Sequence, residues 1–345
     1  MEAMKMTGRI TYRMPDGAEI ESESGSTVKI SVTMPSDDVG YIGRQCPGCK
    51  RMFRLQVEDY QALPDDLRLT CPYCCAVDSH SEFLTEQQQQ RALGAAGEYA
   101  TQLIEARVDE MFTNMTRRVN SGGGAIRMSY SGSAPSRRVP EPLPTIVEEA
   151  PIRERACHRC RTRYAVFGEH VACPVCGLHS PSTIAMDAFD AQEAVLSVMD
   201  HVPPSVLAEL REAGALEKTA AGVLGSVVST NEAFLKQTFL ARVASGVAII
   251  ADKGNVFQRL GDAAELYKNH LATDLPGTLG LVDWDRLVVL YGIRHLLTHN
   301  NGIVDAKHLE RFPGRGFVLG QRVTVSITDA QEALGISRRL IRIIP

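Results

Sequence analysis

The sequence contains no long apolar run. None of its stretches approaches the roughly eighteen consecutive apolar residues that a membrane-spanning helix needs, and the first eight residues lack the apolar core of a secretory signal. A basic excess is also missing, because 37 lysine and arginine residues stand against 41 aspartate and glutamate residues. This balance excludes a protein that coats nucleic acid uniformly, although it permits local basic patches. We expect a cytoplasmic protein that makes no contact with a membrane.

The sequence also lacks the cysteine pattern of a disulfide framework. Eight of its nine cysteines form four Cys-x-x-Cys pairs, and this spacing lets one tight turn present two thiolates to one metal ion. The pattern indicates zinc in a reducing compartment. At 345 residues the chain is long enough for two or three domains.

Shifts in composition divide the chain into six segments. We expect a mainly α fold, in which a helical bundle follows two small zinc ribbons, a long helix and a short β-rich N-terminal segment. Strands are expected at Ile10–Met14 and Val28–Val32, with a turn at Asp16 and Gly17. The predicted segments are a β-rich segment at 1–42, a first ribbon at 43–84, a long helix at 85–119, a flexible Ser/Gly/Pro linker at 120–150, a second ribbon at 151–182 and a helical domain at 183–345.

The cysteine pairs form two matched blocks that resemble zinc ribbons. The predicted ligands of two structural Zn²⁺ ions are Cys46, Cys49, Cys71 and Cys74 in the first block, and Cys157, Cys160, Cys173 and Cys176 in the second. Four thiolates close the coordination shell, so no position is left for a substrate. Redox pairs or buried free thiols are the alternative interpretation. Cys75 is expected to be a spare thiol.

The second block has a local excess of positive charge. Arg155, Arg159, Arg161 and Arg163 are candidates for binding RNA phosphates. The first block has no such excess. A small fold that only needs the metal for stability is an equally good interpretation of both blocks.

Amphipathic segments follow one another almost to the end of the chain. Loop residues such as Pro203 and Gly214 separate them. The predicted helices are 188–202, 204–213, 230–243, 256–271 and 283–299. The pattern predicts an all-α bundle.

The segment Arg294-His295-Leu296-Leu297-Thr298-His299-Asn300-Asn301-Gly302-Ile303-Val304-Asp305 resembles the Arg-polar-x-x-x-His signature of HEPN domains. The resemblance covers roughly residues 225–345, and it implies a closing strand at Gly320–Val325 and a closing helix at Asp329–Ile343. It implies a dimer in which two copies of the motif meet in one cleft. It also implies a metal-independent endoribonuclease, with Arg294, His295 and His299 as catalytic residues, a homodimer as the active form, and a toxin or phage-defence role under the control of a regulatory protein or antitoxin.

The residues themselves allow this chemistry. A histidine can take a proton from a ribose 2′-hydroxyl or give one to the leaving oxygen, and an arginine can stabilise charge on the phosphoryl group, so the product is a 2′,3′-cyclic phosphate. His295 and His299 share a helix face, whereas Arg294 lies about 140° around the helix from His299. The two histidines could instead bind zinc, or Arg294 could cap the helix while the histidines pack at a dimer interface.

Two functions of other classes remain open at this stage. One is a non-catalytic adaptor, whose ribbons bind nucleic acid or protein and whose bundle only dimerises. The other is a zinc-ribbon accessory factor of transcription or translation, for which the motif at Arg294 would be a coincidence.

Overall fold

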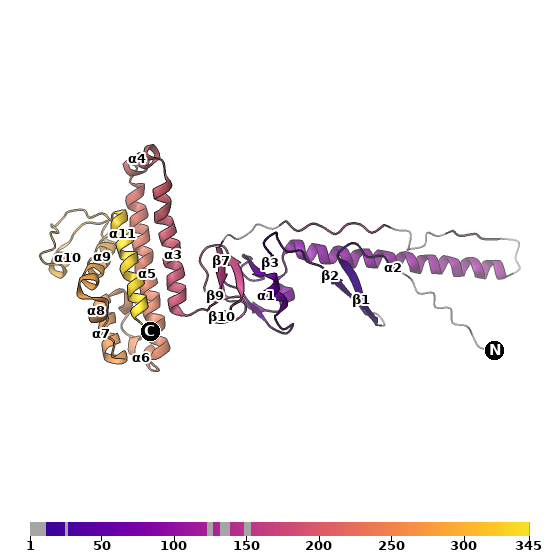
Figure 1. The fold of residues 1–345 in the computed structure, drawn as a ribbon, viewed down its shortest axis with the longest axis horizontal. Helices are drawn as coiled ribbons and strands as arrows, with labels where there is room; N and C mark the ends of the chain where they lie inside the picture. The colour runs from indigo at the N-terminus through magenta and orange to yellow at the C-terminus, as the bar shows by residue number, and fades with distance from the viewer. Residues whose placement is uncertain (1–11, 25–26, 123–126, 132–138, 148–152, 345) are drawn as a thin grey trace. The chain divides into compact units, whose positions relative to one another are not determined.

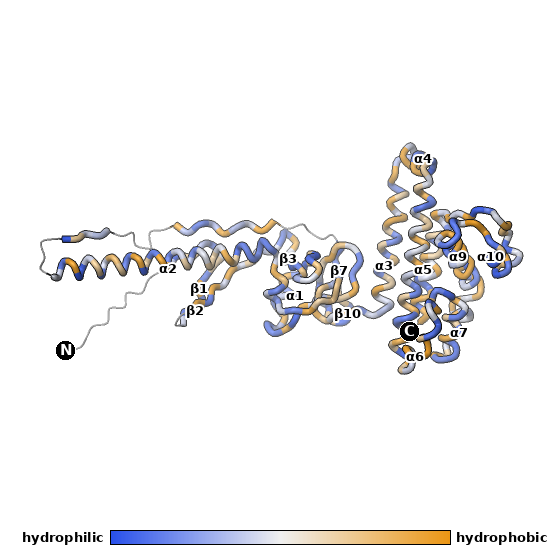
Figure 2. The backbone as a smooth tube through the Cα atoms, turned by 180° about the vertical axis from the view of Figure 1, so that it is seen from behind, coloured by the Kyte–Doolittle hydropathy of each residue, from blue (hydrophilic) through white to orange (hydrophobic). Residues whose placement is uncertain are grey.

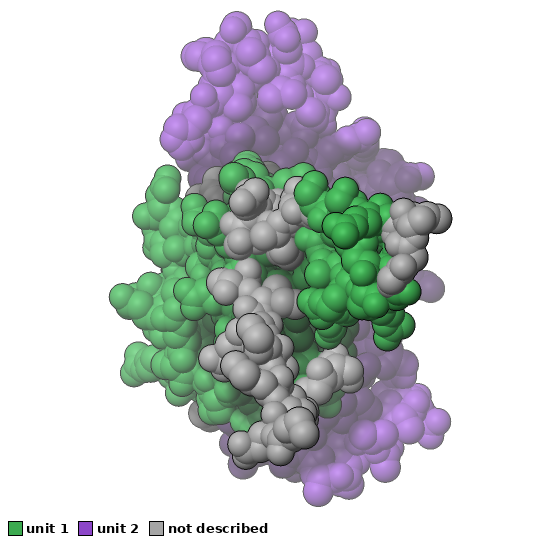
Figure 3. All heavy atoms as spheres, turned by 90° about the vertical axis from the view of Figure 1, so that its right-hand side faces the viewer, with its two compact units in different colours: residues 1–167, 173–177 green, residues 168–172, 178–345 purple. Residues whose placement is uncertain are grey.

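The computed structural model describes residues 12–24, 27–122, 127–131, 139–147 and 153–344. The chain is mainly α-helical, and the strands in its described part all lie before residue 179 (Figure 1). It divides into two compact units, which Figure 3 colours separately: unit 1 comprises residues 1–167 and 173–177, and unit 2 comprises residues 168–172 and 178–345.

Unit 1 is built around a four-stranded antiparallel sheet in the order β3-β4-β8-β7, with β3 at Tyr41–Gln45, β4 at Met52–Gln56, β8 at Arg163–Val166 and β7 at Arg153–Ala156. Phe53 is opposite Val166 and Leu55 is opposite Tyr164 across the β4–β8 pair. Because β4 belongs to the first cysteine block and β8 to the second, one sheet joins the two blocks. Sequence patterns had treated them as separate ribbons.

Short elements complete the two blocks. Helix α1 (Val57–Gln61) follows β4 directly. The hairpin of β5 (Leu69–Thr70) and β6 (Val77–Asp78) carries the second cysteine pair of the first block, and β9 (Ala172–Cys173) and β10 (Gly177–Leu178) do the same in the second block. A 3₁₀ turn at His80–Phe83 leads to the long helix.

Helix α2 (Glu86–Ser121) confirms the predicted long helix and begins with a capping box between Thr85 and Gln88. Its buried positions are mostly polar: the Gln88 side chain donates to the Gly43 carbonyl at 2.8 Å and accepts from Arg44 at 3.1 Å. Several apolar side chains of α2 are exposed, among them Leu93 and Ile104. Figure 2 colours the hydrophobic residues along this helix orange. The side chains by which this helix packs against the rest of unit 1 are therefore mostly polar.

The N-terminal hairpin differs from the prediction. It consists of β1 (Ala18–Ser24) and β2 (Thr27–Val32), so the second predicted strand is confirmed. The first is wrong for Tyr12–Met14, since the backbone N–H and C=O of Arg13 bond to the side chain of Gln102 on α2 (2.9 and 2.6 Å) and not to a neighbouring strand. Ile10 lies outside the described residues.

Two described parts of the predicted linker, residues 127–131 and 139–147, contact α2. The Asn120 side chain bonds to the backbone of Met128, the Tyr130 ring stacks on Phe112, and Leu143 is buried. These two parts therefore lie along the helix.

Unit 2 is a helical bundle in which α5 (Ala215–Arg242) packs between α3 (Pro181–Ser197) and α11 (Ile327–Ile343) (Figure 1). Its core contains Phe189, Phe239 and Leu290, and a buried hydrogen bond joins Asn231 of α5 to Ser337 of α11 at 2.7 Å. The remaining helices are α4 (Pro204–Glu212), α6 (Gly246–Ile250), α7 (Leu260–Leu271), α8 (Leu275–Leu279), α9 (Leu281–His299) and α10 (Ala306–Arg311), with 3₁₀ turns at Val198–His201 and Val256–Gln258.

The predicted closing strand at Gly320–Val325 does not form a strand. Only an isolated bridge pairs Ile303 with Arg322, supported by hydrogen bonds such as that from the Val323 N–H to the Gly302 carbonyl at 2.8 Å. The pairing is too short for a sheet because the partner segment turns into α10 at Ala306.

Candidate metal centres and nucleic-acid site

The eight predicted ligands form two clusters of four cysteines each. In each cluster the four sulfur atoms all lie within 4.8 Å of one another. The Sγ atoms of Cys46 and Cys74 are 3.6 Å apart, and those of Cys157 and Cys176 are 3.4 Å apart. A tetrahedron with Zn–S arms of about 2.3 Å has edges of about 3.8 Å. Both four-cysteine clusters are therefore positioned to hold a metal ion of zinc's size.

A left-handed residue follows the second cysteine of every pair. Lys50, Cys75, Arg161 and Gly177 have φ values of 60°, 61°, 66° and 79°. In the turn at Lys50, the N–H of that residue donates to the Cys46 carbonyl at 3.0 Å, and the turns at Cys75 and Arg161 repeat this bond. Cys75 occupies this turn position, outside the four-cysteine cluster.

Burial controls the ionisation of the clustered thiols. It raises the pKa of Cys71 and Cys173 well above the ordinary thiol value, and that of Cys176 to about 11. At Cys74 burial also acts upward, but hydrogen bonds from the Ala76 backbone and from Cys46 lower the pKa to about 7. Four thiolates held together in one cluster thus require a cation to neutralise them.

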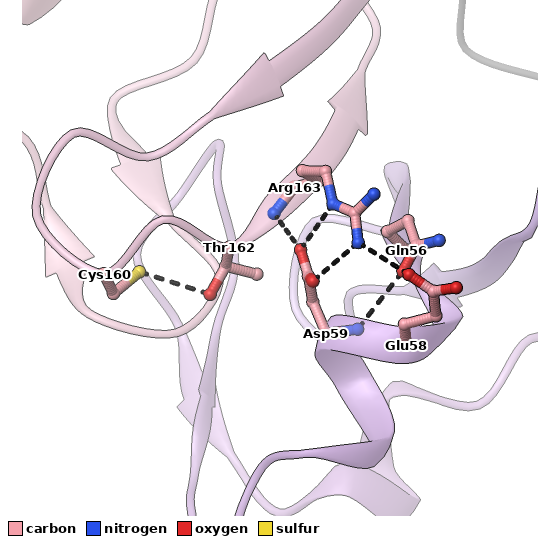
Figure 4. A network of polar contacts seen from close by, with 6 residues as sticks. All are labelled: Gln56, Glu58, Asp59, Cys160, Thr162 and Arg163. Atoms are coloured by element: carbon pink, nitrogen blue, oxygen red, sulfur yellow. Dashed lines mark hydrogen bonds and ion pairs between the residues drawn. The ribbon is translucent and has the colours of Figure 1, made fainter.

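Arg163, a predicted RNA-binding residue, instead joins the two cysteine blocks (Figure 4). Its guanidinium contacts the carboxylates of Asp59 at 2.8 Å and Glu58 at 3.1 Å, and its backbone N–H donates to Asp59 at 2.7 Å. The hydrogen bonds from Arg163 lower the pKa of Asp59. Arg159 also turns inward, donating to the carbonyls of Cys176 and Gly177 at 3.0 and 3.2 Å.

The two other arginines predicted to bind RNA lie beside this network. The Arg155 side chain donates to the Glu154 carbonyl at 3.4 Å, and Arg161 is exposed at its turn position. Of the four predicted guanidiniums, that of Arg163 thus links the two cysteine blocks, whereas that of Arg159 bonds within the second block.

The predicted catalytic histidines lie together on the last two turns of α9. Both His295 and His299 are exposed, and their ring centroids are 4.7 Å apart. Partial burial, His299, and the positive charges of Arg311 and Arg294 lower the pKa of His295 below its ordinary value. A neutral imidazole next to a second one can accept a proton at pH 7.

Arg294 lies on a different face of α9 from the histidines. Together with Thr298 it lines a groove of about 420 Å³ whose floor is formed by α5 residues, among them Gly222 and Gly225. Neither histidine lines this groove. The Nε of Arg294 is buried and has no hydrogen-bond partner among the described residues.

The residues after the motif have evident structural functions. The Asn300 side chain donates to the Ile303 carbonyl at 2.6 Å, and Asp305 caps α10 by accepting from the His308 N–H at 2.8 Å. Gly302 has a φ of 78°, and a Cβ there would meet the Val323 carbonyl oxygen at 2.9 Å. His308 is buried against Phe312 and Phe317.

Positive charge near the motif is partly neutralised. Eight basic residues and four acidic ones occur between Arg294 and Pro345. Three of the basic residues, Arg315, Arg338 and Arg339, form ion pairs with carboxylates elsewhere in unit 2. The positive electrostatic field near the motif is therefore weaker than the count of eight basic and four acidic residues indicates.

Comparison with known proteins identifies no relative: no family model, curated protein or solved structure matches the chain. Within the described part of the chain, no helix combines the length and apolar character needed to cross a membrane.

Sequence reasoning missed the α5 side of the groove and Glu169, which also lines it. The available signal was the run of small residues from Gly222 to Thr230, which includes Gly225, Ser226 and Ser229. Such a run leaves space beside a helix. Nothing in the local sequence around Glu169 marks it as part of the groove.

Proposed function

We propose that the chain is a metal-independent endoribonuclease of the HEPN type. The observation that supports this best is the exposed imidazole pair of His295 and His299, 4.7 Å between ring centroids, on the same helix end as an arginine whose Nε has no partner among the described residues. In the proposed reaction one imidazole takes the proton of a ribose 2′-hydroxyl, whose oxygen attacks the adjacent phosphorus. The P–O5′ bond breaks, the leaving oxygen receives a proton from an imidazolium, and a 2′,3′-cyclic phosphate results.

The lowered pKa of His295 gives it a specific part in this proposal. In this proposal His299 handles the proton of the attacking hydroxyl. His295 assists this step, because a histidine that is neutral at pH 7 is suited to accept a proton. Arg294 supplies the charge that stabilises the phosphoryl oxygens. This arrangement requires RNA, because DNA lacks the 2′-hydroxyl.

A homodimer is part of the proposal. One copy of unit 2 offers two imidazoles and one guanidinium on separate faces of α9, which is a sparse catalytic site. A twofold axis near α9 would bring two copies of the motif to one cleft. Control by a regulatory protein or antitoxin, and a cytoplasmic location, belong to the same proposal.

We further propose that both four-cysteine clusters hold structural Zn²⁺. The sulfur–sulfur distances fit its tetrahedral coordination, and four cysteines leave no open position for catalysis. Metal analysis of protein purified without added zinc should give two equivalents per chain. A value near zero in folded protein would contradict the assignment.

A non-catalytic adaptor is the second candidate. The engagement of Arg163 with Asp59 and Glu58 favours it, because this guanidinium is already paired within unit 1. In that case the ribbons would recognise a partner without using all their arginines, and the bundle would only dimerise.

Incubation of the purified protein with total RNA, with and without EDTA, separates the two candidates. The ribonuclease proposal predicts cleavage that yields 2′,3′-cyclic phosphates and survives the chelator unless the ribbons unfold. His299→Ala should reduce the rate about a hundredfold to ten-thousandfold, with little change in RNA binding, whereas His270→Ala, an exposed histidine outside the motif, should not change it. Sedimentation should show a dimer. Binding without cleavage under all conditions would favour the adaptor.

A further inference from the structure

The groove beside Arg294 lies entirely within unit 2. It runs between α5 and α9 and has a volume of about 420 Å³. Gln192 of α3 lines it as well. From α9 it is lined by Arg294 and Thr298, and from α5 by Gly222, Gly225, Ser226, Ser229 and Thr230. Most of these side chains are polar or absent, so the groove suits a polar ligand better than an apolar one.

Two glycines keep the groove open. Gly222 and Gly225 lie in the middle of α5, where each costs about 1 kcal/mol relative to alanine. A Cβ added at either position would meet no atom within 4 Å, so packing inside unit 2 does not require a glycine there. The space above α5 is therefore free for something that is not part of unit 2.

The polar groups of the groove differ in what they offer. Arg294 lines the groove, and the positive charge of its guanidinium favours an anion such as a phosphodiester. The hydroxyls of Ser229 and Thr298 donate to the carbonyls of Gly225 (3.0 Å) and Arg294 (2.9 Å). Their oxygens are consequently left to accept a hydrogen bond, which a ribose 2′-hydroxyl can donate.

The groove also lies beside the histidine pair. Arg294 and Thr298 are four residues apart on one line along α9, and His295 and His299 form the next line, about 100° around the helix. A strand whose phosphate contacts Arg294 from the groove would have its neighbouring nucleotide at the edge next to these imidazoles.

We propose that this groove binds the sugar–phosphate backbone of a single RNA strand. One phosphodiester contacts Arg294, and a ribose 2′-hydroxyl donates to Ser229 or Thr298. The proposal rests on the proposed ribonuclease function, for which it names the strand-binding surface. The carboxylate of Glu169, which also lines the groove, opposes the anion and weakens binding.

The decisive variant is Gly225→Leu, which fills the groove with a side chain. The helix should tolerate it, because leucine is a better helix former than glycine and its Cβ meets no neighbour. We expect the affinity for a labelled single-stranded oligoribonucleotide, measured by fluorescence anisotropy, to fall at least tenfold with no loss in melting temperature. Gly261→Leu on α7 is the matched control, since that glycine is equally open and lies outside the groove; its affinity should not change.

Two further variants test the chemistry. Glu169→Gln should tighten RNA binding severalfold, and more at low salt, because it removes a negative charge from the groove. The double variant Ser229→Ala with Thr298→Val should reduce the preference for RNA over DNA of the same sequence, since it removes the hydroxyl acceptors.

The outcomes separate this proposal from the ribonuclease proposal. If Gly225→Leu binds and cleaves RNA like the unmutated protein, the groove assignment is wrong while the ribonuclease stands. If the unmutated protein never cleaves but Gly225→Leu abolishes its RNA binding, the groove assignment stands and the ribonuclease falls. If Gly225→Leu turns a dimer into a monomer in sedimentation, the groove is a subunit interface and the RNA assignment is overturned.

Discussion

Unit 1 and unit 2 bury different kinds of side chain. Four of the eleven buried residues in the main core of unit 1 are cysteines of the two four-cysteine clusters, namely Cys46, Cys71, Cys157 and Cys173. The core of unit 2 contains no cysteine and is made of leucine, isoleucine, valine, alanine and aromatic side chains. A small sheet that buries few apolar residues gains stability from metal binding, whereas a bundle of this size gains it from packing. The two units should therefore respond to different perturbations.

The largest expected effect is the loss of the unit 1 sheet on loss of a ligand. Cys173→Ser should abolish the second metal site and remove amide exchange protection from β4 and β8, while the helices of unit 2 keep theirs. Cys75→Ser is the matched control, because Cys75 lies outside the cluster. Hydrogen exchange read by mass spectrometry distinguishes the strands from α5 and α11. If the amides of β8 stayed fully protected from hydrogen exchange in Cys173→Ser, unit 1 would not depend on the metal more than unit 2 does.

Truncation of a side chain in the unit 2 core should destabilise unit 2 and leave the metal sites of unit 1 intact. Phe239 is fully buried among Phe257 and Tyr267, so Phe239→Ala should cost about 3–5 kcal/mol in the free energy of unfolding of the bundle. The metal content should stay at two equivalents. Urea titration followed by helical circular dichroism gives the first quantity and metal analysis the second. Val247→Ala, at an exposed position, serves as the control and should leave the urea midpoint nearly unchanged.

A smaller effect is expected at the start of α11. Ser326 and Asp329 form its capping box, and Asp329 also pairs with Arg286 of α9. Ser326→Ala should lower the free energy of unfolding of unit 2 by about 1 kcal/mol. Although burial acts to raise the pKa of Asp329, its bonds to Ser326 and Arg286 outweigh this and lower it.

The sign of the pH dependence follows from that shift. The stability contributed by Asp329 is fully present above the ordinary carboxyl pKa and is lost as the pH falls through the lowered value. Asp329→Asn should therefore narrow the difference between the urea midpoints of unit 2 at neutral and acidic pH. If the difference between the two urea midpoints stayed the same, other carboxylates would account for the loss of stability at acidic pH.

The smallest expected effect concerns the candidate site. The pKa of His295, followed by its ring proton resonances in NMR, should lie below 6.5, and Arg311→Gln should move it upward toward that value by removing a positive charge. Because the histidine pair lies in unit 2, chelation of the metals should leave this pKa unchanged. A pKa above 6.5 would mean that His295 is not kept neutral by its surroundings.

Local patterns in the sequence predicted a good part of these structures. The Cys-x-x-Cys spacing identified both four-cysteine clusters, because one turn fixes each pair. The boundaries of α2, α4 and α9 agree with the expected helices to within two residues, since Thr85, Pro204 and Asn300 mark their ends. The helical repeat alone predicted that His295 and His299 lie together on one face of α9.

Features that depend on distant residues could not be predicted. The first half of α5 was missed because Gly222 and Gly225 interrupt its periodicity, although the helix there is buried against α3 and α11. Arg163 pairs with Asp59, which is 104 residues away, and β4 pairs with β8 across a similarly long stretch of sequence. No local pattern specifies such a partner.

This long separation has a consequence for synthesis on the ribosome. At about 5–20 residues per second, roughly 5–20 s pass between the emergence of Asp59 and that of Arg163. During this interval β4 is an open strand edge, able to pair with a neighbouring nascent chain. The first cysteine block already holds its complete ligand set by Cys74, so metal capture can precede closure of the sheet. Metal supply during translation should therefore govern how much of the chain escapes aggregation.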